Sequence, residues 1–118
     1  MKFQKLELWQ LSYQLSCSIY IETKELRDWG FKDQITRSGL SVPSNIAEGI
    51  ERQGAKEQVQ FLYIAKASLA EVMTQAMIGK DIGYLEAGFV DELLTKSERV
   101  SAMLAGLIKS IKARNLTS

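Results

Sequence analysis

Apolar residues recur along most of the chain at alternating steps of three and four positions, the spacing that gathers side chains on one face of an α-helix. Four segments show this pattern, at about residues 6–24, 31–51, 55–80 and 87–113. Only one proline and eight glycines interrupt the chain, which favours long helices over many short strands. The short connections between the segments make successive helices antiparallel neighbours. The pattern therefore predicts an all-α, up-down-up-down four-helix bundle, as a single domain over residues 1–118.

The second segment contains the one proline of the chain, Pro43. Proline lacks an N–H, and its ring presses on the carbonyl four residues earlier, which here belongs to Gly39. The apolar stripe nevertheless keeps its phase across Pro43, so we predict one helix kinked at this residue rather than two helices. Ser41 and Ser44 are placed to bond the backbone groups that such a kink frees. The connection before this helix is expected at residues 26–30, ending at Gly30.

The third segment is apolar around most of its circumference. Between residues 58 and 79 only Lys66 and Glu71 are charged, and apolar side chains such as Ile64 and Met77 lie outside the seam that faces the bundle. A helix of this kind must be buried on more than one side. Because a helix in a four-helix bundle normally keeps one face in water, we expect a partner subunit on this segment.

The first segment carries a second stripe about 100° from its core stripe, made of Leu6, Trp9, Tyr13 and Tyr20. Aromatic side chains in such a stripe either pack in a wide core or a subunit interface, or stack on bases. No arginine interleaves with them and acidic residues lie nearby, which favours packing. We expect Cys17, on the same helix, to be a small buried hydrophobe.

Composition places the chain among ordinary folded proteins, with 46% hydrophobic and 25% charged residues. The net charge of +1 attracts neither nucleic acid nor membrane by itself, so any such binding needs a local patch. A lone cysteine excludes an internal disulfide and suits a reducing compartment. Neither a signal peptide nor a run of roughly 20 apolar residues is found, so we expect a cytoplasmic protein without a membrane span.

Catalytic chemistry has little support in the sequence. The chain has no histidine, which removes the usual ligand of di-iron bundles and the commonest general base for a serine or cysteine nucleophile. The run GIERQGAK at residues 49–56 has the lysine one residue late for a phosphate-binding loop, and no strand precedes it. We predict a turn between helices there, and no enzyme activity, cofactor or metal site.

A long motif covers the second and third segments. Its residues are Gln34, Arg37, Ser38, the nonapeptide SVPSNIAEG at 41–49, Arg52, Phe61, Leu62, Ala65 and the SLAE at 68–71. This motif resembles the signature of bacterial four-helix-bundle proteins encoded in intervening sequences of large-subunit ribosomal RNA genes. The chain is more distantly similar to the accessory protein of diversity-generating retroelements, a basic pentameric barrel that engages nucleic acid and a reverse transcriptase. The resemblance implies a bundle and a ring of subunits, and assigns no activity.

Two residues depart from the family pattern. Thr36 precedes Arg37 where relatives often carry a second basic residue, which weakens the expectation of nucleic-acid binding. Ala67 stands where a glycine is common, which limits how closely helices approach. The fold implied by the resemblance does not depend on either position.

Candidate phosphate contacts follow from the basic residues. Arg37 and Arg52 are the first choice, with Lys56 and Lys66 as helpers. A second cluster near the end of the chain comprises Lys109, Lys112 and Arg114. Basic residues at a helix C-terminus are also favoured by the helix dipole, so this cluster has two interpretations. Repetition around a ring would turn a weak patch on one subunit into a strong one.

The polar residues of the motif form a second set of candidates, namely Asn45, Glu48, Ser68 and Glu71. If buried between helices, these groups need mutual hydrogen bonds and then fix helix register or assembly. The sequence thus predicts a non-enzymatic cytoplasmic oligomer, by resemblance a pentamer, that binds structured RNA or a nucleoprotein. The alternative is a structural or protein-binding homo-oligomer with no affinity for nucleic acid.

Overall fold

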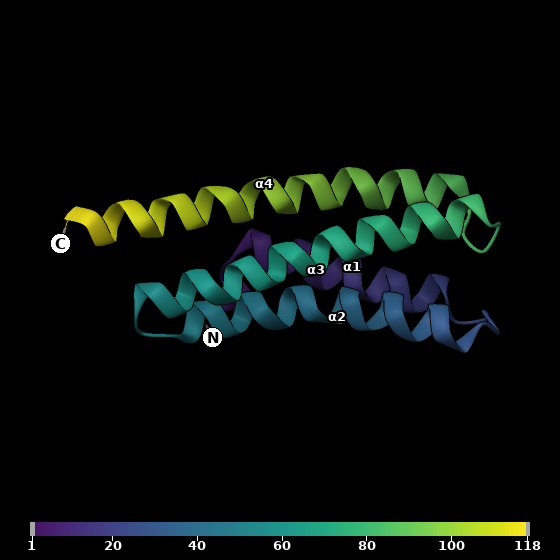
Figure 1. Cartoon of the computed structure of the whole chain (residues 1–118), viewed down its shortest axis with the longest axis horizontal. Coiled ribbons are helices and arrows are strands. Elements are labelled where there is room, and N and C mark those ends of the chain that lie inside the picture. Colours follow the sequence, from purple (N-terminus) through teal and green to yellow (C-terminus); the bar gives the residue numbers. More distant parts are fainter. Residues whose placement is uncertain (1, 118) are drawn as a thin grey trace.

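The computed structural model describes the backbone of residues 2–117 and the side chains of residues 2–115. A short 3₁₀-helix, η1 (Lys2–Lys5), precedes four long helices: α1 (Glu7–Glu22), α2 (Trp29–Glu51), α3 (Ala55–Asp81) and α4 (Ala87–Thr117). The helices run alternately up and down along a body of 51 × 22 × 21 Å (Figure 1). The predicted all-α four-helix bundle is confirmed, and no strand occurs in the described part of the chain.

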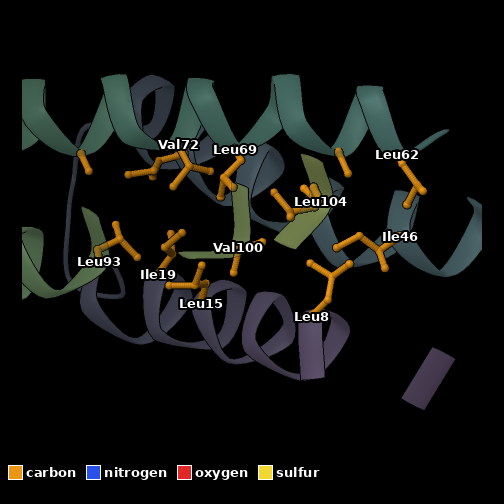
Figure 2. Packing of buried hydrophobic residues seen from close by; sticks show 14 of the residues in the cluster. Leu8, Leu15, Ile19, Ile46, Leu62, Leu69, Val72, Leu93, Val100 and Leu104 are labelled. Atoms are coloured by element: carbon orange, nitrogen blue, oxygen red, sulfur yellow. The ribbon is translucent and has the colours of Figure 1, made fainter. Parts of the chain in front are cut away.

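Each helix packs beside its neighbours in sequence, and α4 closes the bundle by packing on α1 as well as on α3. One core runs through all four helices (Figure 2). At one end of the cluster Leu8, Ile46, Leu62 and Leu104 meet, one from each helix, while Ile19, Val72 and Leu93 lie toward the other end. These residues are the periodic apolar positions of the sequence, which explains why the periodicity predicts the bundle.

Helix α2 begins two residues earlier than the sequence pattern indicates. The Asp28 carboxylate accepts a hydrogen bond from the backbone N–H of Phe31 at 3.1 Å, which satisfies one of the free donors of the first turn. Gly30 therefore lies inside the helix, and the expectation that it ends the connection is wrong. The corresponding turn before α4 does use a left-handed glycine, Gly83, with φ 81°.

Pro43 is buried inside α2, which continues through it from Trp29 to Glu51 as one helix. The single helix is confirmed, and the kink stays a prediction. Ser44 bonds the carbonyl of Leu40 at 2.8 Å, whereas the carbonyl that lacks the proline N–H belongs to Gly39, so the bonding of a freed group by Ser44 stays a prediction. The Ser41 hydroxyl bonds a side chain on α3.

Helix α4 is the longest, with 31 residues, and its C-terminal turns extend past the turn between α2 and α3 (Figure 1). Near its middle, Arg99 pairs with Glu7 at the start of α1. Within the described residues α4 makes close backbone contacts with α3 and α1, and none with α2 or η1. No helix in the described residues has an apolar stretch long enough to cross a bilayer.

Candidate functional site

The predicted basic residues gather at one end of the molecule, with one exception. Six of them line three hollows near the α2–α3 turn and the end of α4, namely Arg52, Lys56, Lys66, Lys109, Lys112 and Arg114. The exception is Arg37, whose Nε donates to both carboxylate oxygens of Asp33 at 3.0 Å on the exposed side of α2. This pairing offsets the charge of the arginine, so Arg37 is a weaker candidate than the sequence indicates.

The most distinctive hollow is a groove of about 460 Å³ between α3 and α4, which we call the lysine groove. From α3 come Tyr63 and Lys66, three residues apart and therefore on one helix face. The rest of the wall comes from the C-terminal half of α4: Ala105, Ile108, Lys109, Lys112 and Ala113. The same three- and four-residue spacing brings these side chains to the side of α4 that faces α3.

Lys112 and Tyr63 are in direct contact across the groove. The Lys112 ammonium donates a hydrogen bond to the Tyr63 hydroxyl at 2.9 Å and lies 5.1 Å from the centre of the ring. An ammonium this close to the hydroxyl and this far from the ring centre lies beside the hydroxyl, so the contact is an exposed hydrogen bond worth about 0.5–1.5 kcal/mol. Lys112 is therefore held at the edge of the tyrosine only weakly.

Among the described residues, the lysine groove carries positive charge without a counter-charge. Its wall contains three lysines and no acidic residue. Lys66 is half-buried, and within residues 2–117 neither Lys66 nor Lys109 makes an ion pair. Holding uncompensated ammonium groups together is unfavourable, and an incoming anion relieves that repulsion. The groove is suited to an anionic ligand.

The hollow at the α2–α3 turn differs in charge. It is lined by Glu51, Arg52, Gln53, Gly54, Lys56 and Glu57. Arg52 pairs with Glu48 at 2.8 Å and lies 3.9 Å from Glu57, and its guanidinium sits 4.7 Å from the centre of the Phe61 ring. Basic and acidic groups are balanced here, so this turn is a weaker anion site than the lysine groove. The predicted turn between helices at GIERQGAK is confirmed.

Arg114 faces a third hollow, on the other side of α4. Gln53, Ala55, Gln58, Ile111 and Asn115 complete its wall, and its volume is about 360 Å³. Arg114 also lies in the last turns of α4, where a cation is favoured by the helix dipole. This position fits both interpretations of the C-terminal basic cluster, contact with phosphate and interaction with the helix dipole.

The predicted polar network exists in part. The hydroxyls of Ser41 and Ser68 lie 2.8 Å apart, and the Asn45 amide donates to the Ser41 hydroxyl at 2.9 Å and to its carbonyl at 2.8 Å. Glu48 is exposed and belongs instead to the ion pair with Arg52. Glu71 is also exposed, and no hydrogen bond or ion pair joins it to the other described residues. The network thus joins α2 and α3 through Ser41, Asn45 and Ser68.

Two surfaces of the single chain remain apolar and exposed. On the outer side of α3, apart from Tyr63 in the lysine groove, lie Ile64, Met77 and Ile78, each 41–49% exposed. On α1, Tyr13 and Tyr20 are about half exposed, and Cys17 is exposed between them. The expectation of a buried Cys17 is wrong, because this residue continues the aromatic stripe rather than the core stripe. Within the described residues, no cluster of three or more metal-ligating side chains occurs.

The pattern of the 23S rRNA-intervening sequence protein family matches residues 4–106. The chain belongs to this family. A solved structure of a protein with unknown function from the S23 ribosomal protein family of Bacteroides thetaiotaomicron is similar to it, with TM-score 0.81 and 22% identity over 86% of this chain and 98% of that one. At this identity the similarity shows the fold. No curated protein matches the chain.

Membership in the 23S rRNA-intervening sequence protein family accounts for the bundle but not for all of the lysine groove. The family match ends at residue 106, before Lys109 and Lys112. Sequence reasoning identified the three lysines separately and missed Tyr63. The available signal was its position three residues before Lys66, in an apolar helix where few polar side chains occur.

Proposed function

We propose that this chain is a non-enzymatic interaction module of the cytoplasm, which assembles with copies of itself and binds structured RNA or a nucleoprotein through its basic end. The observation that carries this proposal is the lysine groove, with three lysines and no carboxylate in its wall. Most protein contacts to nucleic acid are made to phosphate, and lysine supplies such contacts as a point charge. In a ring the groove would be repeated around the axis, so a long RNA could reach several copies at once.

Titration of a labelled RNA hairpin, and of a duplex DNA of equal length, with the purified assembly over a series of salt concentrations tests the proposal. Affinity should fall steeply with salt, because each phosphate contact releases counterions from the nucleic acid. Lys66→Gln, Lys109→Gln and Lys112→Gln should each reduce the slope of log affinity against log salt by about 1. Lys96→Gln is the matched control, since Lys96 lies on α4 outside the lysine groove and pairs with Glu92.

The control variant should bind RNA as the wild type does. Absence of binding at low salt, with the assembly intact, would rule out the nucleic-acid function. Equal salt slopes for the lysine variants and the wild type would instead move the binding surface away from the lysine groove.

We place the self-association on the outer side of α3 and on the aromatic stripe of α1, and the resemblance implies five subunits. Ile78 on α3 is 49% exposed in the single chain, whereas Leu69 on the same helix is 1% exposed. Ile78→Glu should therefore leave a folded chain that does not assemble, whereas Leu69→Glu places a charge in the core and breaks the bundle itself. Ser110→Glu, on an exposed position of α4, is the control.

Sedimentation equilibrium and circular dichroism distinguish these outcomes. The wild type should have five times the 13.3 kDa mass of one chain. An Ile78→Glu protein with the full assembled mass would remove the outer side of α3 from the interface. A folded Leu69→Glu protein of unchanged mass would contradict the core position of Leu69.

The same exposed apolar surfaces favour a second candidate function, a structural or protein-binding homo-oligomer without affinity for nucleic acid. Catalysis is not part of either proposal. The chain has no histidine, and the pKa values of the Asp28 and Glu92 carboxyl groups are lowered. Hydrogen bonds at the protein surface explain these shifts, whereas a general acid needs a raised pKa.

A further inference from the structure

The lysine groove combines three properties that one ligand must match. Its three ammonium groups require negative charge. Ala105, Ile108 and Ala113 give it an apolar wall, which is covered best by a flat or apolar group. The ring of Tyr63, 47% exposed, offers an aromatic surface at the edge of the same space.

A nucleotide has all of these complementary parts in a single unit. Its phosphates match the lysines, and its base can lie on an aromatic ring, since stacking is available to every base. Inorganic phosphate would leave the apolar wall in water, and an acidic peptide segment would supply charge without a base to stack. The groove volume of about 460 Å³ lies within the roughly 300–1,000 Å³ of small-ligand sites.

We propose that the lysine groove holds one unpaired nucleotide of the RNA, with the base stacked on Tyr63 and the adjoining phosphates on Lys66, Lys109 and Lys112. This inference rests on the proposed function for the class of partner and narrows the bound part of the RNA to an unpaired segment. A base inside a duplex is paired and stacked, and A-form RNA offers protein side chains little access to it. Loops, bulges and ends present bases that can enter the groove.

Lys112 changes its partner in this binding, from the Tyr63 hydroxyl to a phosphate. In the free protein its ammonium donates to the Tyr63 hydroxyl and lies 5.1 Å from the ring centre, beside the hydroxyl. This hydrogen bond is exposed, so it is weak and exchanges readily with water. When a nucleotide enters, Lys112 exchanges the hydroxyl for a phosphate oxygen, and the open face of the ring receives the base.

The test compares two RNAs with the same number of phosphates, one a blunt duplex and the other a hairpin with an unpaired loop. Binding of each to the wild type, Tyr63→Leu and Tyr63→Phe is measured by fluorescence anisotropy at one salt concentration. The loop RNA should bind the wild type about tenfold more tightly than the duplex, because stacking adds to the phosphate contacts. Tyr63→Leu should remove this preference, and Tyr63→Phe, which keeps the ring, should retain it.

Circular dichroism and the assembled mass of each variant show whether a change in binding comes from lost structure, and Tyr63→Phe serves as the conservative variant. As a second readout, 4-thiouridine in the loop should cross-link on irradiation to the tryptic peptide 57–66, which contains Tyr63. Cross-links confined to other peptides would overturn the proposal even if a Tyr63 variant failed to fold.

The remaining outcomes separate this inference from the proposed function. Suppose that the wild type and Tyr63→Leu bind both RNAs with the same affinity, while the lysine variants bind more weakly. This result would overturn the nucleotide site and leave the proposed RNA binding in place. No binding of either RNA at low salt would overturn both. Polyglutamate and unlabelled loop RNA can be compared as competitors at equal total charge. If polyglutamate displaces the labelled loop RNA equally well, the groove binds an acidic protein segment instead.

Discussion

The hydroxyl groups of Ser41 and Ser68 lie 2.8 Å apart and join α2 to α3 at the centre of the family motif. Asn45, one turn further along α2, donates its amide to the same Ser41 hydroxyl. A hydrogen bond between two helices fixes their register, because sliding either helix by one turn separates the partners. This part of the motif therefore acts on the packing of α2 against α3, and the RNA-binding surface that we propose lies elsewhere.

Ser68→Ala should lower the free energy of unfolding by about 0.5–1.5 kcal/mol, because the half-buried Ser41 hydroxyl loses its partner on α3. Urea denaturation at a fixed protein concentration measures the change. Ser44→Ala is the control, since the Ser44 hydroxyl is exposed and bonds only the Leu40 carbonyl of its own helix. A loss in the control as large as in Ser68→Ala would show that the interhelix bond adds nothing of its own.

The last residue of the nonapeptide at 41–49, Gly49, permits a close approach of the same two helices. A Cβ at this position would lie 3.2 Å from the Gln58 carbonyl oxygen and 3.3 Å from side-chain atoms of Phe61 and Leu62. The carbonyl belongs to the α3 backbone, so it yields only if α3 moves. Gly49→Ala should destabilise the fold by about 1–3 kcal/mol, as overpacked cores do.

Gly106→Ala is the same chemical change at an open position, where a Cβ would meet nothing within 4 Å. This variant should be more stable than the wild type by up to about 1 kcal/mol, because alanine favours the helix over glycine. Thermal denaturation of both variants under identical conditions shows whether each substitution raises or lowers the stability of the fold. Stabilisation by Gly49→Ala would mean that α2 and α3 separate at little cost, contrary to this packing.

The sequence predicts much of the fold because hydrophobic periodicity reports directly on which side of a helix is buried. The periodicity of residues 55–80 predicts a seam that faces the other helices, and all five of its members are buried in α3: Leu62, Ala65, Leu69, Val72 and Ala76. The predicted start of α2 is wrong by two residues, because glycine is common as a helix breaker, whereas here Asp28, a good N-cap residue, begins the helix before Gly30. The prediction that Cys17 is buried is wrong, because a helix with two apolar stripes leaves open which stripe faces the core.

The lysine groove could not be predicted in the same way. Lys66 and Lys109 are far apart in the sequence and meet only because their faces of α3 and α4 adjoin. Periodicity gives the buried face of each helix, but not how far one helix is shifted along its neighbour. Ion pairing is partly readable from the sequence, since Glu48 stands four residues before Arg52 and the pair is expected if both are exposed. The structure shows this pair and also places Asp33 beside Arg37, which makes both arginines weaker phosphate candidates than the lysines.

Asp28 should make the stability of the bundle sensitive to acid. The backbone N–H of Phe31, and after it the hydroxyl of Tyr84, lower the pKa of this carboxyl below its ordinary value. A group whose pKa is lowered by folding stabilises the fold above its unfolded pKa, about 3.9, and loses that contribution as the pH falls through its folded pKa. The stabilisation should therefore be complete well above the unfolded pKa and be lost as the pH falls through the lowered pKa of the folded state.

Asp28→Asn tests this dependence, because asparagine keeps the helix cap without the charge. The difference in unfolding free energy between wild type and Asp28→Asn, measured in urea at several pH values, should be constant from pH 5 to 7 and shrink below about pH 4. Tyr84→Phe removes only one of the hydrogen bonds to the carboxylate and should give a smaller change. A difference that grows on acidification would reverse the sign of the pKa shift.

Cys17 provides a probe of the proposed assembly, since it is exposed in the single chain between Tyr13 and Tyr20. If the aromatic stripe of α1 is an interface, its thiol should react slowly with a disulfide reagent at concentrations where the protein is assembled, and faster on dilution below the assembly range. The reason is that the reagent reaches an interface residue only after the subunits dissociate.

A double variant with Cys17→Ser and Ser110→Cys is the control, because its thiol lies on an exposed position of α4 and should react rapidly at every concentration. Equally rapid reaction of Cys17 in the assembled wild type would remove α1 from the interface and leave α3 as the surface through which the chains meet.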